Sequence, residues 1–435
     1  MSLGGGTFVT QNKVLPGAYI NFISAISASE SLTDRGIAAI GLDLNWGIDG
    51  EIFEVTNADF KEESLRIFGY EYTDAKMKGL RDLFLNAKML YAYKLTSNGE
   101  KATNEYATAK HSGTRGNDLK IVISLNADEP DNFDVKTYLG TLIVDAQTVA
   151  TADKLVANDF VKFKSDAVLT VTAGTALSNG SNGVIDGASH TAFLAKAESY
   201  SFNAIGVIST DDEVNGLYAA YAKRMRDELG VKFQAVTYHK AYDYEGVVNV
   251  KNKVINAGWS EASLVYWVTG IIAGCEVNKS NLNKSYNGEF TIDTNYTQSQ
   301  LEAAIKAGEF TLHKVGPNVR VLADINSMVT ISDTKSDIFK ENQTIRVIDQ
   351  IANDIAVLFN TKYLGAIPND ASGRISLWSD VVKHHKALQN IRAIENFQDS
   401  DVVITQGATK KSVVVSDVVT VVNAMGQLYM TVTVQ

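Results

Sequence analysis

Residues 202–238 read FNAIGVISTDDEVNGLYAAYAKRMRDELGVKFQAVTY, and this stretch decides the fold class. Its first eight residues form an apolar run typical of a buried strand, and KFQAVTY at 232–238 forms a second one. The residues between the two runs predict a helix closed by Gly230, because glycine is common just beyond helix C-termini. Strand, helix and strand in this order are typical of an α/β sheet.

The segments on either side continue this pattern. AFLAKAESY at 192–200 predicts a helix, and GIAAIGLDLNWG at 36–47 predicts an apolar strand followed by a polar turn. TDAKMKGLRDLFLNAKML at 73–90 predicts an amphipathic helix with Thr73 as its N-cap. The apolar stripe of that helix comprises Met77, Leu80, Leu83, Phe84 and Ala87. ASLVYWVTGIIAGC at 262–275 is too short to span a bilayer and predicts a buried helix.

Three further helices are expected later in the chain. YTQSQLEAAIKAGEF at 296–310 predicts one with Thr297 as N-cap and Gln300 as its capping-box partner. The apolar stripe of the second comprises Ile345, Ile348, Ile351, Ala352, Ile355, Leu358 and Phe359. The stripe of the third comprises Leu377, Val381, His384, Leu388 and Ile391. After Phe397 the pattern returns to strands.

The sequence pattern changes between about Thr96 and His190, where helical periodicity gives way to short strand-like runs. Short strand-like runs such as LKIVISL, FDVKTYL and TLIVDAQTV follow one another with turns between them, and the segment ends in the loop LSNGSNGVIDGASH. We therefore predict a β-rich domain inserted into the α/β pattern.

Each end of the chain carries an isolated strand pattern. The alternation in AYINFIS places Ala18, Ile20 and Phe22 opposite Tyr19, Asn21 and Ile23. At the C-terminus the pattern GQLYMTVTVQ places one set of side chains on one face and a second set on the other. The first set comprises Leu428, Met430, Val432 and Val434, and the second comprises Tyr429, Thr431, Thr433 and Gln435. A terminal strand with an apolar face must pair with a sheet, in its own body or in another molecule.

Composition excludes several classes of protein. Of the 435 residues, 45% are hydrophobic and 21% charged, as in a globular chain, and the net charge of −10 argues against sequence-independent DNA binding. The single cysteine, Cys275, excludes a disulfide framework within the chain and favours an inert core thiol. The N-terminus has no apolar run typical of a secretory signal, so we expect synthesis in the cytoplasm.

Catalytic and cofactor motifs are missing from the sequence. No phosphate-binding loop, nucleophile elbow or H-E-x-x-H pattern occurs. His384 and His385 are adjacent, but neighbours diverge around a helix and no ligand follows at the next turn, so we expect no metal. NDASGR at 369–374 lacks the ligand spacing of a calcium loop. We expect no cofactor and favour a structural role over catalysis.

Several stretches resemble contractile phage tail sheath proteins, in particular those of Gram-positive myophages, prophages and phage-tail-like bacteriocins. The resemblance runs in order through GGGTFVTQNKVLPGAYINFIS, LDLNWG, SGTRGNDLKI, FTLHKVGPNVRVLADINS, IRVIDQIANDIAVLFNTKYLGAIPNDASGR and QLYMTVTVQ, from Gly4 to Gln435. It implies a subunit that stacks in rings, six to a ring, around an inner tube. A baseplate signal lets the assembled sheath shorten and drive the tube through a cell envelope, with no nucleotide consumed.

The resemblance also implies a domain order in a multi-domain α/β fold. The expected parts are an N-terminal arm (1–24), the first part of an inner α/β core (25–95), an inserted β-rich outer domain (96–190), the main α/β core (191–426) and a C-terminal arm (427–435). Strands Ala18–Ile23 and Leu428–Val434 would pair with sheets of neighbouring subunits. Lys383, Lys386 and Arg392 on a late helix are candidates to face the tube.

The implied partners are further copies of the chain, an inner tube protein, and baseplate and terminator proteins, with no nucleic acid and no membrane insertion. The implied location is a virion tail or tail-like particle assembled in the host cytoplasm. Two other interpretations stay open at the level of sequence. One is an α/β enzyme without a linear motif, which a deep pocket with a perturbed polar cluster would favour. The other is a monomeric binding module whose last strand closes its own sheet.

Overall fold

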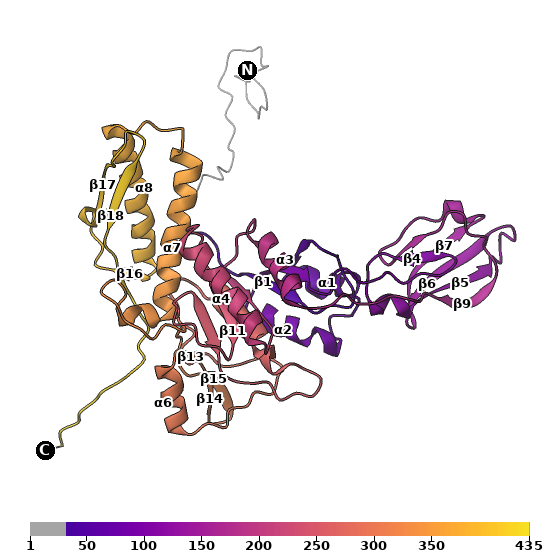
Figure 1. Ribbon diagram of the computed structural model, residues 1–435, viewed down its shortest axis with the longest axis horizontal. Helices are drawn as coiled ribbons and strands as arrows, with labels where there is room; N and C mark the ends of the chain where they lie inside the picture. The colour runs from indigo at the N-terminus through magenta and orange to yellow at the C-terminus, as the bar shows by residue number, and fades with distance from the viewer. Residues whose placement is uncertain (1–31, 435) are drawn as a thin grey trace, which may run out of the picture.

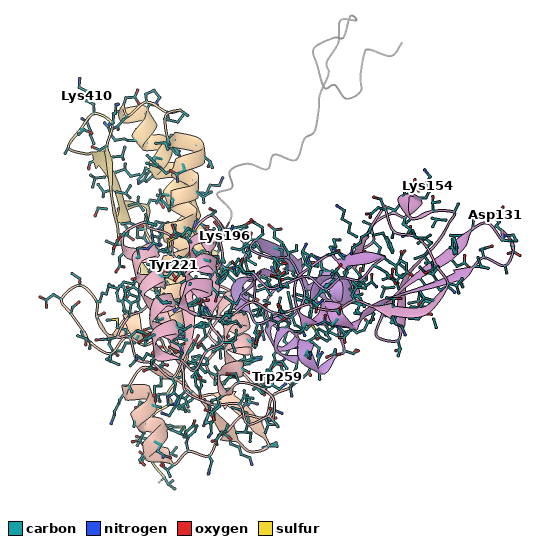
Figure 2. The ribbon with its side chains drawn as sticks, turned by 45° about the vertical axis from the view of Figure 1, so that its right-hand side comes forward. Asp131, Lys154, Lys196, Tyr221, Trp259 and Lys410 are labelled. Carbon is teal, nitrogen blue, oxygen red and sulfur yellow. The ribbon has the colours of Figure 1, made fainter. Side chains whose placement is uncertain are left out.

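The computed structural model describes residues 32–434, so the expected strand Ala18–Ile23 lies outside the described residues. The molecule is elongated, with a central α/β body between a β-rich lobe and a part built around two long helices (Figure 1). Figure 2 shows Asp131 at the far end of the lobe and Lys410 at the outer end of the opposite part. The mixed α/β class with several domains is thus confirmed.

A seven-stranded sheet forms the centre of the body, in the order β13-β12-β11-β10-β1-β3-β2. All neighbouring strands are parallel except β2 and β3. The strands are β1 (Ile37–Leu42), β2 (Ile52–Thr56), β3 (Met89–Lys94), β10 (Ala204–Gly206), β11 (Gln234–Tyr238), β12 (Val247–Val250) and β13 (Glu309–Phe310). The unit predicted from residues 202–238 is present as β10, α4 and β11, with β10 and β11 parallel.

Helices cover both faces of this sheet. The helices of the body are α1 (Asn57–Phe68), α2 (Lys78–Phe84), α3 (Gly187–Ala197), α4 (Asp212–Asp227), α5 (Leu264–Gly274) and α6 (Gln298–Lys306). Alternate residues of β1 face opposite cores: Ala38 packs with α1, α2 and α5, whereas Ala39 packs with α3 and α4. Helix α5 is buried, as its apolar sequence predicts. A hairpin of β14 (Leu312–Val315) and β15 (Asn318–Val321) lies beside this body.

The helix predicted at 73–90 is shorter than expected. A 3-10 turn at Ala75–Met77 leads into α2, and the N-cap is Asp74, whose side chain accepts a bond from the Lys76 amide, and not Thr73. The helix ends at Phe84 because the backbone then joins the sheet: the amides of Lys88 and Met89 donate to the Gly36 carbonyl. The predicted apolar stripe is nevertheless buried.

The lobe contains an antiparallel sheet in the order β7-β6-β5-β9 and a separate pair of strands. Its strands are β4 (Ala107–Ala109), β5 (Leu119–Leu125), β6 (Phe133–Leu139), β7 (Leu142–Val149), β8 (Val161–Phe163) and β9 (Thr172–Ala176). The two connections to the body lie side by side, since the Gly183 amide donates to the Thr96 carbonyl at 2.9 Å. Helix α3 begins at Gly187 and packs on the central sheet, so the last residues of the predicted insertion lie in the body.

One histidine at the base of the lobe should make stability depend on pH. His111 packs edge-on against Trp46, with ring centroids 5.1 Å apart. Burial lowers the pKa of His111 from 6.5 to about 4. The unfolded chain therefore binds more protons than the folded chain between these two values, and stability rises with pH there.

We expect the unfolding temperature to fall as the pH is lowered from 6.5 towards 4, with a loss of at most about 3 kcal/mol from this residue. Well above pH 6.5, where the histidine is unprotonated in both the folded and the unfolded chain, His111 contributes no pH dependence. Calorimetry of the parent and of His111→Gln across this range tests the assignment. Identical pH profiles for the two proteins would contradict it.

The C-terminal part contains two long helices and two short strand pairings. Helix α7 (Asn342–Leu358) continues into a π-helical turn at Phe359–Tyr363, and α8 (Ala371–Asn390) follows. The strands are β16 (Ile394–Glu395) paired with β19 (Thr420–Val421), and β17 (Val402–Gln406) paired with β18 (Val413–Asp417). In residues 32–434 no helix combines the length and apolar character needed to cross a membrane.

Helix α7 differs from the amphipathic helix that its sequence predicts. Of its expected apolar stripe, Ile345 and Leu358 are buried, but the stripe between them is only half-buried. The face that contacts the body is polar instead. Its buried polar side chains are Asn342, Gln343, Thr344, Arg346, Asp349, Gln350 and Asp354. Tertiary hydrogen bonds and ion pairs compensate this burial, which sequence periodicity does not reveal.

Candidate assembly surface

The C-terminal segment 422–434 leaves the body as an extended chain (Figure 1). Within the described chain these residues form no strand, although their alternation predicts one. The apolar side chains are exposed: Met430 by 74%, Val432 by 68% and Val434 by 88%. A strand requires hydrogen bonds to a second strand, and within residues 32–434 this segment has no such partner.

The base of this segment is held firmly, in contrast to its tip. We call Val422–Ala424 the C-terminal root. Gln343 on α7 bonds it twice, since its Nε2 donates to the Val422 carbonyl at 3.0 Å and its Oε1 accepts from the Ala424 amide at 2.9 Å. Thr344 and Asn423 also bond through their side chains, at 3.2 Å. Because Gln343 is buried, these bonds fix where the segment leaves the body.

The hairpin of β17 and β18 offers edges to which a further strand could add. It packs against α8, where the Trp378 indole donates to the Val402 carbonyl at 2.9 Å. Among residues 32–434 the hairpin has no third strand, so both of its outer edges lack a pairing partner. Val403 and Val414 are about half exposed on it, by 50% and 52%. A two-stranded sheet of this kind is only marginally stable by itself.

The other end of the described chain is also attached to α7. We call Leu32–Arg35 the N-terminal root. The Thr33 hydroxyl donates to the Asp354 carboxylate, and Gln350 Nε2 donates to the Thr33 carbonyl at 3.1 Å. The Arg35 guanidinium donates to the carbonyls of Ile272 and Cys275 at the C-terminal end of α5, where the helix dipole favours a cation.

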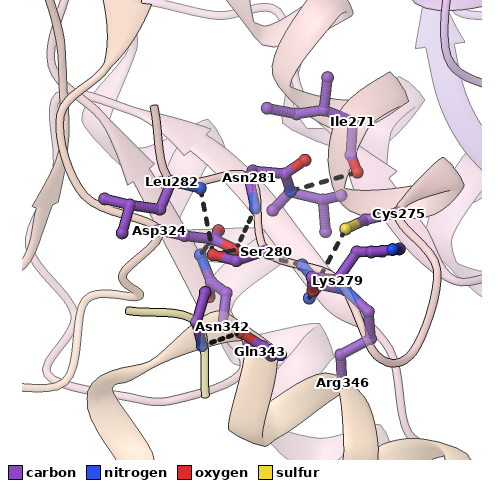
Figure 3. Close-up of polar contacts among 12 residues, drawn as sticks. Ile271, Cys275, Lys279, Ser280, Asn281, Leu282, Asp324, Asn342, Gln343 and Arg346 are labelled. Carbon is purple, nitrogen blue, oxygen red and sulfur yellow. Dashed lines mark hydrogen bonds and ion pairs between the residues drawn. The ribbon is translucent and has the colours of Figure 1, made fainter. Parts of the chain in front are cut away.

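Buried charges connect the polar face of α7 to the body. Asp324 accepts from the Asn281 amide at 2.8 Å and from Asn342 Nδ2 at 3.0 Å, and Arg346 lies 3.4 Å away (Figure 3). Further along the helix, Asp349 forms a bidentate pair with Arg226 of α4 at 2.6 and 2.7 Å. These contacts fix α7 to the sheet domain and to the segment around Asn281 and Asp324.

The comparisons with known proteins identify the family. The phage tail sheath β-sandwich, central and C-terminal domain models match residues 97–182, 183–327 and 334–435. The phage-like element PBSX protein XkdK of Bacillus subtilis is 30% identical over 468 residues, covering 99% of this chain and 100% of that relative. This chain belongs to the phage tail sheath family. The resemblance seen in its sequence, and the function of a sheath subunit that it implies, are thereby confirmed.

Solved structures agree with this assignment. The sheath tail protein of Desulfitobacterium hafniense is 35% identical to this sheath protein, with a TM-score of 0.79 over 90% of this chain and 93% of that chain. The sheath tail protein of Listeria innocua is 30% identical, with a TM-score of 0.78 over 91% and 94%. The contracted sheath of the anti-feeding prophage is only 12% identical, with a TM-score of 0.57 over 97% and 99%, and shows a shared fold alone.

The structure places the three cations predicted to face a tube. Lys383 and Lys386 are exposed on α8, and Lys386 pairs with Asp399 at 2.7 Å. Arg392 does not belong to this helix, which ends at Asn390. It lies just beyond it with a φ of 60°, because the chain turns there into β16. A role of these residues towards the tube stays a prediction.

The two adjacent histidines of the sheath protein hold different carboxylates. His384 Nε2 lies 3.0 Å from Asp354 of α7, and His385 Nε2 lies 2.8 Å from Asp417 of β18. No cluster of three or more potential metal ligands occurs within residues 32–434. The histidines therefore act as buried hydrogen-bond donors that connect α8 with α7 and the hairpin. Cys275 is buried and free, and burial raises the pKa of its thiol.

A pocket of about 580 Å³ at the carboxyl ends of β1 and β10 is the place where an α/β enzyme would bind a ligand. Burial raises the pKa of Asp43 there, as the enzyme interpretation requires. The serines of the pocket do not form catalytic pairs, however. Ser209 and Ser260 accept bonds from backbone amides, and in the described chain Ser263 Oγ has no partner. None of these three serines is therefore paired with a base that could activate it as a nucleophile.

Sequence analysis missed the residues that hold the two roots. Gln343, Gln350 and Asp354 are ordinary polar residues in a helical pattern, and only their contacts mark them. The available signal was their spacing: the three positions recur after seven and four residues, as one face of a helix does. The periodicity of the helix predicts instead an apolar stripe made largely of isoleucines, which is only half-buried between Ile345 and Leu358.

Proposed function

We propose that this sheath protein polymerises by strand exchange, with the C-terminal strand of one copy adding to the β17–β18 hairpin of another. One observation carries the proposal. A segment with an alternating apolar face, Leu428–Val434, projects unpaired from a body that contains a two-stranded sheet with open edges. Strand addition joins the two features, because backbone bonds supply affinity and alternate side chains set the register.

The expected strength of one such contact is modest. Burying Met430, Val432 and Val434 would contribute roughly 5–8 kcal/mol, at about 1.5–3 kcal/mol for each side chain. Ordering the extended segment opposes a large part of this gain. A lattice with many copies of the contact is therefore stable although each pair of subunits binds weakly. The arm strand Ala18–Ile23 would add a second contact of the same kind.

The assembled form would consist of stacked rings around an inner tube, in a virion tail or tail-like particle formed in the host cytoplasm. Contraction of this lattice would drive the tube through an envelope, and the energy would come from the extended assembly without any reaction. Tube, baseplate and terminator proteins are the implied partners. Lys383, Lys386 and Arg392 would face a tube of opposite charge, with no catalytic step and no cofactor.

Negative-stain electron microscopy of the concentrated, purified protein tests the proposal. We expect hollow tubes with a regular axial repeat, together with a molecular mass that rises with concentration in sedimentation experiments. A protein that stays monomeric at every concentration, alone and with its tube protein, would contradict self-assembly and favour a monomeric binding module.

The β-rich lobe should be dispensable for assembly. We expect a chain in which residues 97–182 are replaced by a short Gly/Ser bridge to fold and still form sheaths, because Thr96 and Gly183 already lie side by side. Trp46 packs on Phe160 of the lobe, so the variant also carries Trp46→Gln to avoid an exposed indole. Microscopy provides the measurement. A well-folded variant that never forms sheaths would show that the lobe builds the lattice.

A further inference from the structure

The first described residues and the base of the C-terminal segment are attached to one helix, α7. The N-terminal root (Leu32–Arg35) and the C-terminal root (Val422–Ala424) are far apart in sequence, yet each bonds to a glutamine of α7. Gln343 and Gln350 are seven residues apart, which is two turns, so they lie on the same face about 10 Å from each other. The N-terminal root and the C-terminal root are thereby held at a fixed separation.

The N-terminal attachment is a buried network. Asp354 accepts from the Thr33 hydroxyl, from Gln350 Nε2 at 2.9 Å and from His384 Nε2 at 3.0 Å. Burial by itself would raise the pKa of Asp354, but the hydrogen bonds from His384, Thr33 and Gln350 outweigh it and hold this pKa below its usual value. The carboxylate thus stays ionised, and charge-assisted bonds of this kind are stronger than neutral ones.

The C-terminal attachment uses the first turn of the same helix. Gln343 is 4% exposed and bonds the backbone of the root on both sides of Asn423. The Val422 amide in turn donates to the Ala393 carbonyl at 3.0 Å, which continues the pairing of β16 and β19. The root therefore cannot slide along α7 without breaking several buried bonds.

Helix α7 is itself fixed to the body between the two attachments. Arg346 pairs with Asp324, and Asp349 pairs with Arg226, and both Arg346 and Asp349 lie between the two glutamines in the sequence. A force on either root therefore acts on helix α7, and the buried ion pairs of Arg346 and Asp349 keep this helix in place on the body.

We propose that α7 is a strut that transmits force between the two arms, with Gln343 and Gln350 as the positioning residues that hold the C-terminal and N-terminal roots. This inference rests on the proposed strand exchange. A neighbour that pulls on one arm then moves the other arm by the same amount, because the distance between the roots is constant. Contraction passes from subunit to subunit through this helix.

Loss of the bonds that Gln343 makes should lengthen the tether between the body and the C-terminal strand. If the bonds of Gln343 are lost, Val422 stays paired with Ala393, but Asn423 and Ala424 are held only by the bond to Thr344. Once that bond opens, the two residues become part of the tether, which gains roughly 7 Å at about 3.3 Å per residue. The terminal strand can still reach and pair, but the added length absorbs the movement of the neighbour. A variant that lacks these bonds should therefore assemble into extended sheaths but fail to contract.

Gln343→Met tests this, because methionine keeps the length of the side chain but lacks both hydrogen-bonding groups. Gln350→Met tests the other root, and Gln298→Ala, in the exposed helix α6, is the matched control. Each variant is produced within the complete contractile particle. We expect all of them to form extended sheaths, and after a chemical trigger electron microscopy should show contraction for the parent and the control but not for the two α7 variants.

Two further readouts exclude a general loss of structure. Hydrogen exchange of the peptide around Ala424 should become roughly tenfold faster in Gln343→Met, while the thermal unfolding of the body stays close to that of the parent. Variants that contract like the parent would overturn the proposal that α7 transmits force between the arms. Well-folded variants that fail to assemble would overturn it as well. A parent protein that forms no sheath at all would instead overturn the proposed function.

Discussion

Deleting residues 428–435 should leave a folded chain that no longer assembles. The described side chains of this segment make few contacts within the body, since Leu428, Tyr429 and Val434 are each exposed by more than 85%. Their loss should therefore change the stability of the body by no more than about 0.5 kcal/mol, as for other exposed residues. Polymerisation should disappear, because the apolar face that would add to a neighbouring sheet is gone.

Circular dichroism and analytical ultracentrifugation of the truncated chain provide the measurement. A matched pair of full-length variants separates the two faces of the strand. Met430→Ser, Val432→Ser and Val434→Ser together should abolish assembly, whereas Thr431→Ser and Thr433→Ser on the other face should preserve it. A truncated chain that unfolds outright would place the strand in its own core and exclude the exchange.

Asp349→Ala should produce the largest loss of stability of any single substitution considered for this sheath protein. The carboxylate pairs with the Arg226 guanidinium at 2.6 and 2.7 Å, and both side chains are more than 90% buried. Removing one partner leaves an uncompensated charge in the interior, which costs about 3–5 kcal/mol. The helix that carries both roots would also lose a main attachment to the sheet domain.

Urea unfolding of the parent, Asp349→Ala and the double variant Arg226→Met/Asp349→Leu measures this effect. The double variant should regain much of the stability, because it removes the buried charge together with its partner. Glu63→Ala is the control, since Glu63 and Arg66 form an ion pair whose side chains are nearly half exposed, and such pairs contribute little. Equal unfolding midpoints for Asp349→Ala and Glu63→Ala would show that the buried pair does not hold α7.

Local patterns predicted the elements whose stability is local or whose burial is uniform. Thr297 and Gln300 form the expected capping box at α6, and the apolar run around Trp267 is the buried helix α5. The parallel unit of β10, α4 and β11 was predictable because two apolar runs stand on either side of a segment with helical periodicity. The capping box of α6 joins residues three positions apart, so the local sequence contains both partners. Helix α5 and the strands β10 and β11 are buried along their length, so a continuous apolar run is enough to predict them.

The extent of α2 and the orientation of α7 depended on residues far away in the sequence. Helix α2 stops where the backbone near Met89 finds the Gly36 carbonyl, a partner more than fifty positions earlier. The polar face of α7 is buried because Arg226 and Asp324 come to it from other elements. No periodicity within either helix contains that information.

The sequence by itself determined the α/β class, the family and the presence of a terminal segment whose side chains alternate so that one face is apolar. Tertiary structure alone decided that the N-terminal and C-terminal roots are held on one helix, because Gln343 and Gln350 acquire their roles only from the backbone groups that folding brings to them. The strand pattern of Leu428–Val434 remains unpaired in the isolated chain. The physical reason is that side-chain alternation is a property of the segment, whereas a β-ladder needs hydrogen-bonding groups from a second strand.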